Sequence, residues 1–287
     1  METKALIRNT PSRVYGAAEI GFARGNGASR LVHLYERDPL RVLFPRPEAG
    51  EPPLAAIVTT SGGLVAGDHV DVAVRVDDGA AAHVTASAAE KIYRSLGATT
   101  EINQLLTIGD GAALEFLPPE TILFDGARLR RKTVVDLALT AAFLGGGIVI
   151  FGRRARGERF TRGLLHEVWE VRRDGRLVWG DALHLDGDIA AIVDDTACFD
   201  GAAGCATMIL AAAAHDPQQF ITGARMVQAA PATGGLRAGA TVVGGVLVAR
   251  WLAKVAMVLR RDYADLACHL RAEALGLPRR MPRIWHV

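Results

Sequence analysis

The feature that most constrains the fold is a strict alternation of apolar and polar residues directly after a glycine-rich turn. Four valines alternate with small or charged residues between His69 and Asp77. A period of two is typical of a β-strand with one buried face. Asp77-Asp78-Gly79 then predicts a turn, and a second strand follows through Val84. These residues predict neighbouring strands in a mainly β protein.

The residues on either side of these strands, within 59–95, are unusually polar. Thr59, Thr60 and Ser61 lead into Gly62-Gly63, and Gly67-Asp68 closes the turn. Paired glycines allow the backbone to run where a Cβ atom would clash. After the second strand comes a dense ionisable run, Glu90-Lys91-Ile92-Tyr93-Arg94.

The turn at residues 76–81 recurs 32 positions later, at residues 108–113. Each copy leads into a short apolar strand, one ending near Val84 and the other at Phe116. This recurrence indicates stacked strand–turn units, as in a β-solenoid or stacked-sheet fold.

Further strands and two helices follow in the second half of the chain. From residue 128 to 140 a long alternation places Leu129, Arg131 and Thr133 on one face, and Asp174-Gly175 predicts a hairpin after a strand at 164–172. The alanine-rich residues 202–214 and the apolar spacing of residues 254–275 predict helices. We therefore expect a mainly antiparallel, stacked or helical β scaffold with two helices, forming one domain over residues 1–287.

Composition excludes several classes of protein. The formal net charge of +2 is too small to indicate a nucleic-acid partner. Arginines cluster within residues 128–132 and 153–162, which is typical of solvated faces or of a docking surface for an acidic partner.

The sequence also argues against membrane or secreted placement. The longest apolar run, residues 137–151, is shorter than the roughly 18–20 residues of a membrane span. Residues 1–10 lack the apolar core of a signal peptide. An odd count of three cysteines disfavours a disulfide framework and a structural zinc site. We expect a soluble, cytoplasmic protein without a membrane partner.

Two catalytic interpretations fail on the residues. The glycines at 62–67 have no Gly-Lys-Ser/Thr after them, and a strand follows where a phosphate loop needs a helix. Ser61 lies among glycines but outside any Gly-x-Ser-x-Gly motif.

For metals, the eight histidines form no cluster of familiar spacing, so the sequence predicts no tight, dedicated site. Weak, transient handling of a divalent ion by carboxylates is the alternative, because buried carboxylates need a partner or a cation. Each could instead cap a turn or form an ion pair, with Lys91 and Arg94 as partners. The candidates are Asp68, Glu90, Glu115, Glu120, Asp125, Glu167 and Asp181.

Several motifs occur in an order that resembles the UreD family of urease accessory proteins, called UreH in some bacteria. No single motif decides the matter, but together they span most of the chain, from about Arg8 to the C-terminus. The motifs are SGGLVAGD at 61–68, EKIYRS at 90–95, LEFLPPETILFDGA at 114–127, FGR at 151–153 with GE at 157–158, and PRIW at 282–285.

The resemblance implies a helical stack of β-strands with two helices, no catalysis and no tightly bound cofactor. It implies partners: apo-urease, UreF and, through UreF, the GTPase UreG, with which the family delivers two Ni²⁺ ions to urease. An internal passage for nickel is part of this expectation. Asp68 matches the family's Gly-Asp acid, and Lys91, Tyr93 and Arg94 match its Lys-aromatic-Tyr-Arg run.

Two departures from the family pattern stand out. Glu90 occupies a position where the family has Thr or Ser, and Gly146-Gly147 replace a Trp followed by an acid that lines the expected passage. We hypothesise that Glu90 compensates for the missing acid.

Three hypotheses remain open. The first is a non-enzymatic nickel-insertion chaperone with an ion path of carboxylates and hydroxyls. The second is a pure docking scaffold whose inner polar residues are structural. The third is a β-solenoid hydrolase or lyase with a facing pair of acids in an open groove.

Overall fold

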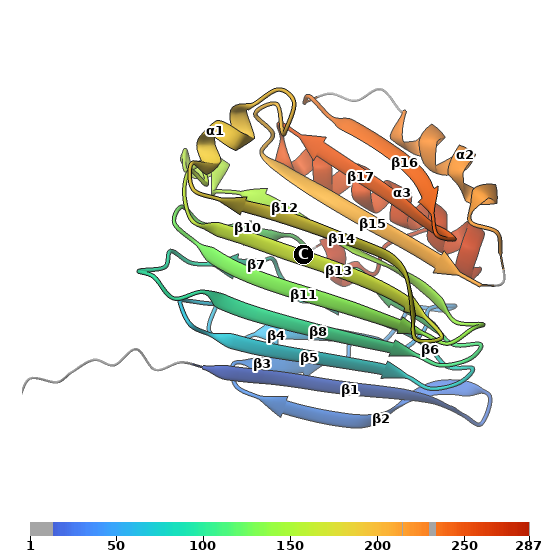
Figure 1. Cartoon of the computed structure of the whole chain (residues 1–287). Helices are drawn as coiled ribbons and strands as arrows, with labels where there is room; N and C mark the ends of the chain where they lie inside the picture. Colours follow the sequence, from blue (N-terminus) through green and yellow to red (C-terminus); the bar gives the residue numbers. More distant parts are fainter. Residues whose placement is uncertain (1–13, 214, 230–233, 287) are drawn as a thin grey trace, which may run out of the picture.

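The computed structural model describes residues 14–213, 215–229 and 234–286. The expectation that residues 1–10 are not a signal peptide therefore lies outside the described residues. The described strands form two stacked sheets, with helices against one of them (Figure 1).

One sheet has seven strands, and its outer face is turned to the viewer in Figure 1. Its strands, in spatial order, are β14 (Arg176–Asp186), β13 (Leu164–Arg173), β11 (Arg128–Leu137), β8 (Thr100–Ile108), β5 (His69–Val76), β1 (Tyr15–Gly25) and β2 (Ala28–Arg37).

The other sheet has ten strands and lies behind the first. Its main path is β16 (Arg237–Val243), β17 (Val246–Ala253), β15 (Gly204–Ala212), β12 (Ala142–Phe151), β9 (Ala113–Phe116), β6 (Ala81–Ala86), β4 (Leu54–Thr59) and β3 (Leu40–Leu43). Two short strands complete it, β10 (Thr121–Leu123) beside β12 and β7 (Glu90–Ile92) beside β10.

The stacking predicted from the repeated turn is confirmed. In the seven-stranded sheet Val76 of β5 pairs with Ile108 of β8, and in the other sheet Ala81 of β6 pairs with Ala113 of β9, each 32 residues on. The two turns also contact each other, since the Gly79 amide donates to the Asp110 carbonyl at 2.8 Å. Each turn of the chain thus adds one strand to each sheet.

The expected antiparallel pairing is wrong for the centre of both sheets. Strands β1, β5, β8, β11 and β13 run parallel, as do β4, β6, β9 and β12. Apolar and polar residues alternate with a period of two in parallel and antiparallel strands alike, so the alternation did not predict the direction of the strands. The antiparallel pairs lie toward the sheet margins, including the confirmed β13–β14 hairpin at Asp174-Gly175.

The core lies in two layers. Alternate side chains such as Val72, Val74 and Leu106 fill the space between the sheets. A second cluster, including Met208 and Leu270, fills the space between the ten-stranded sheet and the two longer helices, whereas the short first helix adds Ile189 and Val193 to the layer between the sheets. The helices are α1 (Ile189–Asp194), α2 (Gln218–Gln228) and α3 (Ala256–Leu275), with 3₁₀ turns at Arg154–Arg156 and Arg283–His286.

One of the two predicted helices is confirmed and the other is wrong. Helix α3 occupies most of residues 254–275 and ends at Gly276, whose φ of 64° suits a glycine cap. The alanine-rich residues instead form strand β15, between β12 and β17. Its Ile209 packs between the sheets and its Met208 toward α3, so tertiary context overrides alanine's helix propensity.

Within the described residues, no helix combines the length and the apolar character needed to cross a membrane.

Candidate functional site

The two polar motifs at 61–68 and 90–95 are joined in space. The Leu64 amide donates to the Lys91 carbonyl at 2.8 Å, and the Tyr93 hydroxyl donates to the Gly62 carbonyl at 3.0 Å. Gly63 has a φ of 147°, and a Cβ there would lie 2.7 Å from the Lys91 carbonyl oxygen. Glycine is therefore required where these segments cross.

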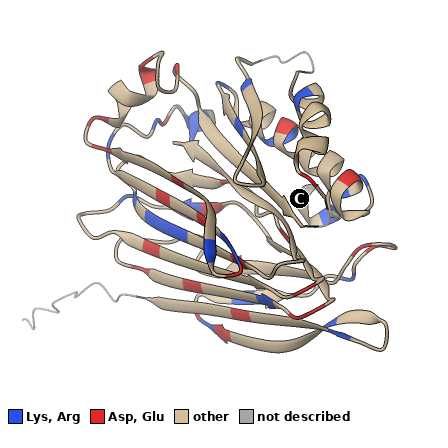
Figure 2. Cartoon of the chain, turned by 45° about the vertical axis from the view of Figure 1, so that its right-hand side comes forward, with Lys and Arg blue, Asp and Glu red and all other residues tan. Residues whose placement is uncertain are grey.

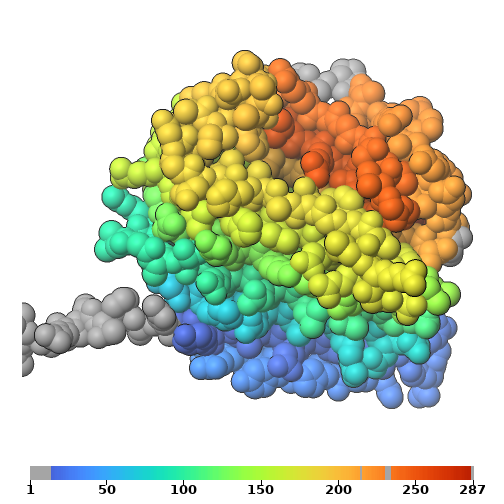
Figure 3. Space-filling model, viewed as in Figure 1, coloured from blue at the N-terminus to red at the C-terminus, as the bar shows by residue number. Residues whose placement is uncertain are grey.

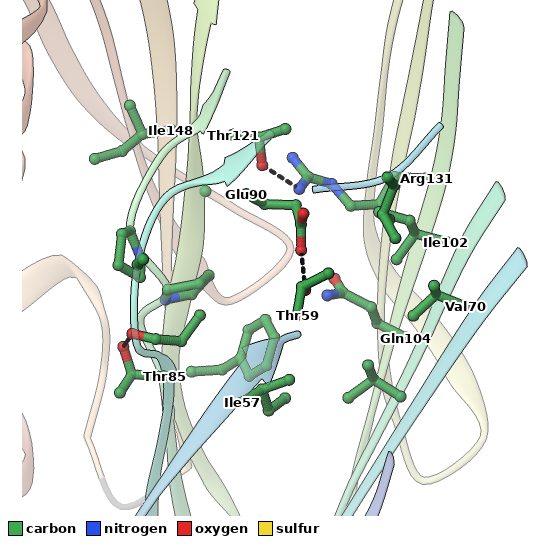
Figure 4. Close-up of a pocket in the computed structure, with 18 of the residues that line it drawn as sticks. Ile57, Thr59, Val70, Thr85, Glu90, Ile102, Gln104, Thr121, Arg131 and Ile148 are labelled. Carbon is green, nitrogen blue, oxygen red and sulfur yellow. Dashed lines mark hydrogen bonds between the residues drawn. The ribbon is translucent and has the colours of Figure 1, made fainter. Parts of the chain in front are cut away.

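Next to this crossing, a cavity of about 70 Å³ with a mainly apolar lining lies between the two sheets. A volume of this size has room for several water molecules. Polar side chains enter it from both sheets, as Figure 4 shows for Thr59 and Glu90 on one side and Gln104 and Arg131 on the other.

Glu90 carries the carboxylate at the centre of this cavity. The Thr59 hydroxyl donates to its Oε2 at 2.6 Å (Figure 4), and the Lys91 amide donates to its Oε1 at 3.2 Å. Burial raises the pKa of the Glu90 carboxyl, and the Thr59 hydrogen bond and the charge of Arg131 only partly oppose this. Glu90 is thus a carboxylate held mainly by a hydroxyl group and without a bonded cation in the described structure.

Arg131 forms the opposite wall. Its Nη2 and Nε donate to Glu167 Oε1 at 2.7 and 3.1 Å, and its Nη1 donates to the Thr121 hydroxyl at 2.7 Å. The Trp169 indole donates to the same Glu167 oxygen at 3.2 Å. Both members of this ion pair are buried, so the carboxylate is neutralised and held in place.

Gly146 and Gly147 contribute bare backbone to the same cavity. A Cβ at Gly147 would lie 3.6 Å from Glu167 Oε1 and 3.8 Å from Arg131 Nη2, which are ordinary contacts. A Cβ at Gly146 would lie 2.0 Å from the Thr207 carbonyl oxygen, which is impossible without backbone movement. A side chain at 147 would therefore project between the cavity and Glu167.

Beyond this wall lies a smaller void of about 30 Å³. It shares Gly147 and Trp169 with the cavity and is also lined by Glu167, Asp181 and Cys205. Burial raises the pKa of the Cys205 thiol to about 12, with a smaller contribution from the charge of Glu167. The thiol therefore stays protonated at neutral pH.

The void shares Asp181, Cys205 and Thr207 with a groove of about 420 Å³. The exposed residues Arg237 and Arg250 also line the groove, and Arg250 pairs with Asp181 at 2.7 Å. Figure 3 shows the surface hollowed there, between β14 and the strands β15–β17. The cavity, the void and the groove are thus neighbouring spaces that have lining residues in common.

Glu90, Glu167 and Asp181 are the three candidate carboxylates that line these neighbouring spaces. The other four lie elsewhere. Glu115 lies on the helix side of the ten-stranded sheet, where its Oε1 accepts from Arg271 Nε at 2.5 Å and its Oε2 faces His83 Nδ1 at 3.1 Å. Burial alone would raise its pKa, but these partners outweigh burial and lower it.

The remaining three candidates have structural partners. Asp68 accepts the Val65 amide at 2.9 Å and so caps its turn. Glu120 accepts from Arg260 at 3.2 Å. Asp125 accepts the amide and the hydroxyl of Thr161, both at 2.8 Å, and these bonds outweigh burial and lower its pKa.

The expected pairing partners were wrong. In the described residues, the ion pairs of these carboxylates involve His83 and five arginines, whereas Lys91 is exposed; the arginines are Arg131, Arg162, Arg250, Arg260 and Arg271. Arg131 was also placed in a solvated or docking cluster, yet it is buried. Its position on the same face as Leu129 and Thr133 was the sequence signal that could have identified it.

No group of three or more His, Cys, Asp or Glu side chains is arranged to hold a metal among the residues with described positions. In the three neighbouring spaces, the carboxylates are instead separated by hydroxyls and arginines. Figure 2 shows acidic and basic segments on different strands of the sheets and on the helices, and the view contains no large face of a single sign.

Comparisons with known proteins agree with the motifs. The family model described as UreD urease accessory protein matches residues 15–286. A urease accessory protein UreD of Magnetococcus marinus is 42% identical over 97% of this chain and 96% of its own length. A urease accessory protein UreD 2 of Methylorubrum populi is 40% identical over 98% of this chain and 95% of its own length.

Both the family match and these relatives extend over nearly the whole chain, including the two segments that cross at Gly63 and the strands that enclose the cavity. The chain therefore belongs to the UreD family of urease accessory proteins.

Proposed function

We propose that this protein is a non-enzymatic scaffold that binds apo-urease in the cytoplasm. With UreF and the GTPase UreG, it supports transfer of Ni²⁺ to the urease active site through its polar interior. Membership of the family ties the chain to urease maturation, and the ion path and the named partners are the proposal.

The observation that carries the proposal is the series of neighbouring spaces, each with an acidic side chain, from Glu90 to the groove. Glu90 lines the cavity, Glu167 lines the void, and Asp181 lines both the void and the groove. Oxygen ligands of this kind suit a divalent ion that must be released, because carboxylates and hydroxyls bind Ni²⁺ less tightly than a cage of His and Cys. The protonated Cys205 thiol also avoids trapping the ion as a thiolate.

The geometry supports the hypothesis that Glu90 compensates for Gly146-Gly147. All three residues line the same cavity, and strands β7 and β12 belong to the same sheet with only β10 between them. The carboxylate that the family has on β12 is thus matched by a carboxylate two strands away on the same wall.

A pure docking scaffold is the second candidate, and two ion pairs favour it. Arg131 neutralises Glu167 and Arg250 neutralises Asp181, as expected for structural polar groups. A hydrolase or lyase is less well supported, because these same pairs leave Glu90 without a facing free acid among the described cavity residues.

The main experiment expresses apo-urease with UreF and UreG, with and without this chain, and measures complex formation by pull-down and urease activity. The proposal predicts that activation requires the chain. Equal activation without the chain would reject any role in maturation.

A second experiment separates the ion path from docking alone. Gly147→Leu fills the junction between the cavity and the void, and Gly239→Leu is a matched control at a strand glycine with open space around it. We expect Gly147→Leu to retain urease in the pull-down but to lose activation, while the control retains both. Full activation by a folded Gly147→Leu variant would favour the docking scaffold.

Glu90→Ala tests the compensating acid. We expect activation to fall by about tenfold, the scale on which supporting residues of metal sites act. Glu101→Gln is the control, because Glu101 lies on the exposed outer face of β8. Normal activation by Glu90→Ala would reject a role for this carboxylate.

A further inference from the structure

Two histidines 18 residues apart meet on the outer face of the seven-stranded sheet. The β13–β14 hairpin pairs His166 with His184, and their Nδ1 atoms are 3.2 Å apart. The ring centroids are 5.2 Å apart with an angle of 71° between the planes. His184 is exposed and His166 half-buried.

This pair is separate from the cavity. The next residue, Glu167, points inward to Arg131, and successive side chains of a strand point to opposite faces. The sheet itself therefore stands between the histidines and the spaces described above. Strands β13 and β14 lie toward the viewer in Figure 1.

The distance between the two Nδ1 atoms matches a shared metal ion. With metal–nitrogen bonds of about 2.0–2.1 Å, nitrogens 3.2 Å apart subtend about 100° at the metal. That angle lies between the values for octahedral and tetrahedral coordination. Without a metal, the two neutral imidazoles can form one hydrogen bond, in which one Nδ1 donates a proton to the lone pair of the other Nδ1. A metal ion instead accepts the lone pairs of both Nδ1 atoms.

We propose that His166 and His184 bind one divalent first-row transition-metal ion through their Nδ1 atoms, with water completing the coordination. Imidazole is a suitable ligand for Ni²⁺, Cu²⁺ and Zn²⁺, and the usual order of stability places Cu²⁺ highest. Two protein ligands in an exposed position give a weak, exchangeable site rather than a permanent one.

The charges around the pair give the proposal a sharper test. Arg130 of β11 occupies the register position beside His166 on the same sheet. Its exposed guanidinium opposes a cation bound there. Asp186 follows His184 by two residues on β14 and so has its side chain on the same face. Removing the arginine charge should tighten metal binding, most clearly at low salt.

The test uses the untagged full-length chain with Ni²⁺ alone, by isothermal titration calorimetry, and with Cu²⁺ by electron paramagnetic resonance. His166→Ala and His184→Ala should each weaken binding by more than about tenfold, because each removes one arm of a chelate. Arg130→Gln should strengthen it severalfold. The Cu²⁺ spectrum should change from two coordinated nitrogens to one in either histidine variant.

His33→Ala is the matched control, since His33 is an exposed histidine on β2 of the same sheet. It should leave the titration unchanged. Binding that persists at full strength in both His166→Ala and His184→Ala, or that falls equally in His33→Ala, overturns the proposal. The readout does not involve urease, so it stands or falls separately from the proposed function.

Discussion

Glu115 and Glu90 are enclosed on opposite faces of the same ten-stranded sheet, and their surroundings differ. Glu115 faces helix α3, where the fully buried Arg271 bonds to both of its oxygens and also to Glu51. Glu90 faces the seven-stranded sheet, where its closest partner is the Thr59 hydroxyl. The first carboxylate is bonded to a cation, and the second lies in a cavity without one.

The pKa directions follow this difference. His83 and Arg271 lower the pKa of Glu115 despite burial, whereas burial prevails at Glu90 and raises its pKa. The comparison teaches that burial alone does not mark a functional acid. A carboxylate neutralised by arginine holds two layers together, while one left with a hydroxyl partner can still take up a proton or a cation.

The largest expected effect comes from removing the arginine that neutralises Glu115. Arg271→Ala leaves Glu115 and Glu51 without their shared cation, and we expect a loss of about 3–5 kcal/mol in the free energy of unfolding. Arg261→Ala, at the exposed end of an i,i+4 pair on the same helix, should cost less than about 0.5 kcal/mol. Urea denaturation of both variants measures the contrast, and similar losses would show that the cluster is not structural.

The next effect tests the cavity wall. Gly146→Ala forces a methyl group onto the Thr207 carbonyl, and we expect a loss of about 1–3 kcal/mol. Gly147→Ala has only ordinary contacts, so its unfolding free energy should change by less than about 1 kcal/mol. Thermal or urea unfolding compares the pair. Equal losses of unfolding free energy in the two variants would contradict the conclusion that a Cβ at position 147 has enough space.

A smaller change isolates the hydroxyl that holds Glu90. Thr59→Val removes the hydrogen bond with little change of shape, and we expect a loss of about 0.5–1.5 kcal/mol at neutral pH. The pKa of Glu90 should rise further, because this hydrogen bond lowers it in the parent chain. Carboxyl NMR titration of both proteins measures the shift, and an unchanged pKa would exclude Thr59 as the main partner.

The smallest expected change comes from neutralising Glu90, and it depends on pH. Because the pKa of Glu90 is raised on folding, the folded state binds more protons, and its stability falls as pH rises from about 4.3 through the folded pKa. Glu90→Gln should therefore be more stable than the parent chain above that pKa, and the gain should disappear in acid.

Glu115 provides the reversed control for this pH profile. Its lowered pKa contributes stability above about 4.3 that is lost as pH falls through the folded pKa. Glu115→Gln should therefore be less stable at neutral pH and approach the parent chain in acid. Relative to the parent chain, the unfolding free energy of Glu90→Gln should rise with pH, and that of Glu115→Gln should fall. Parallel pH profiles for the two variants would refute the opposite pKa shifts of the two acids.

Prediction from the sequence succeeded where the pattern was local. The valines of β5, the turns at Asp78 and Asp110, and the helix ending at Gly276 were identified from spacing and turn residues. It failed for β15, where helix-forming alanines are needed as small side chains in a strand covered on both faces. It also failed for strand direction, because the same alternation serves parallel and antiparallel neighbours.

The candidate site was only partly foreseen for the same reason. Glu90, Glu167 and Asp181 were named as candidates, but so were four carboxylates that lie elsewhere. The surroundings of each acid depend on partners that are far away in the sequence. Arg131, the partner of Glu167, is 36 residues away, and Arg271, the partner of Glu115, is 156 residues away. Spacing along the chain carries no information on such contacts.

The sequence by itself determined the stacked β architecture, the motifs at 61–68 and 90–95 and the family, because each depends on residue types at short spacing. Only the tertiary structure decided that these two motifs cross at Gly63, which acids meet a cation, which line the neighbouring cavities and which histidines face each other. Those outcomes depend on how successive turns of the chain align across two sheets, and the energy of a charge is set by the neighbours that this alignment supplies.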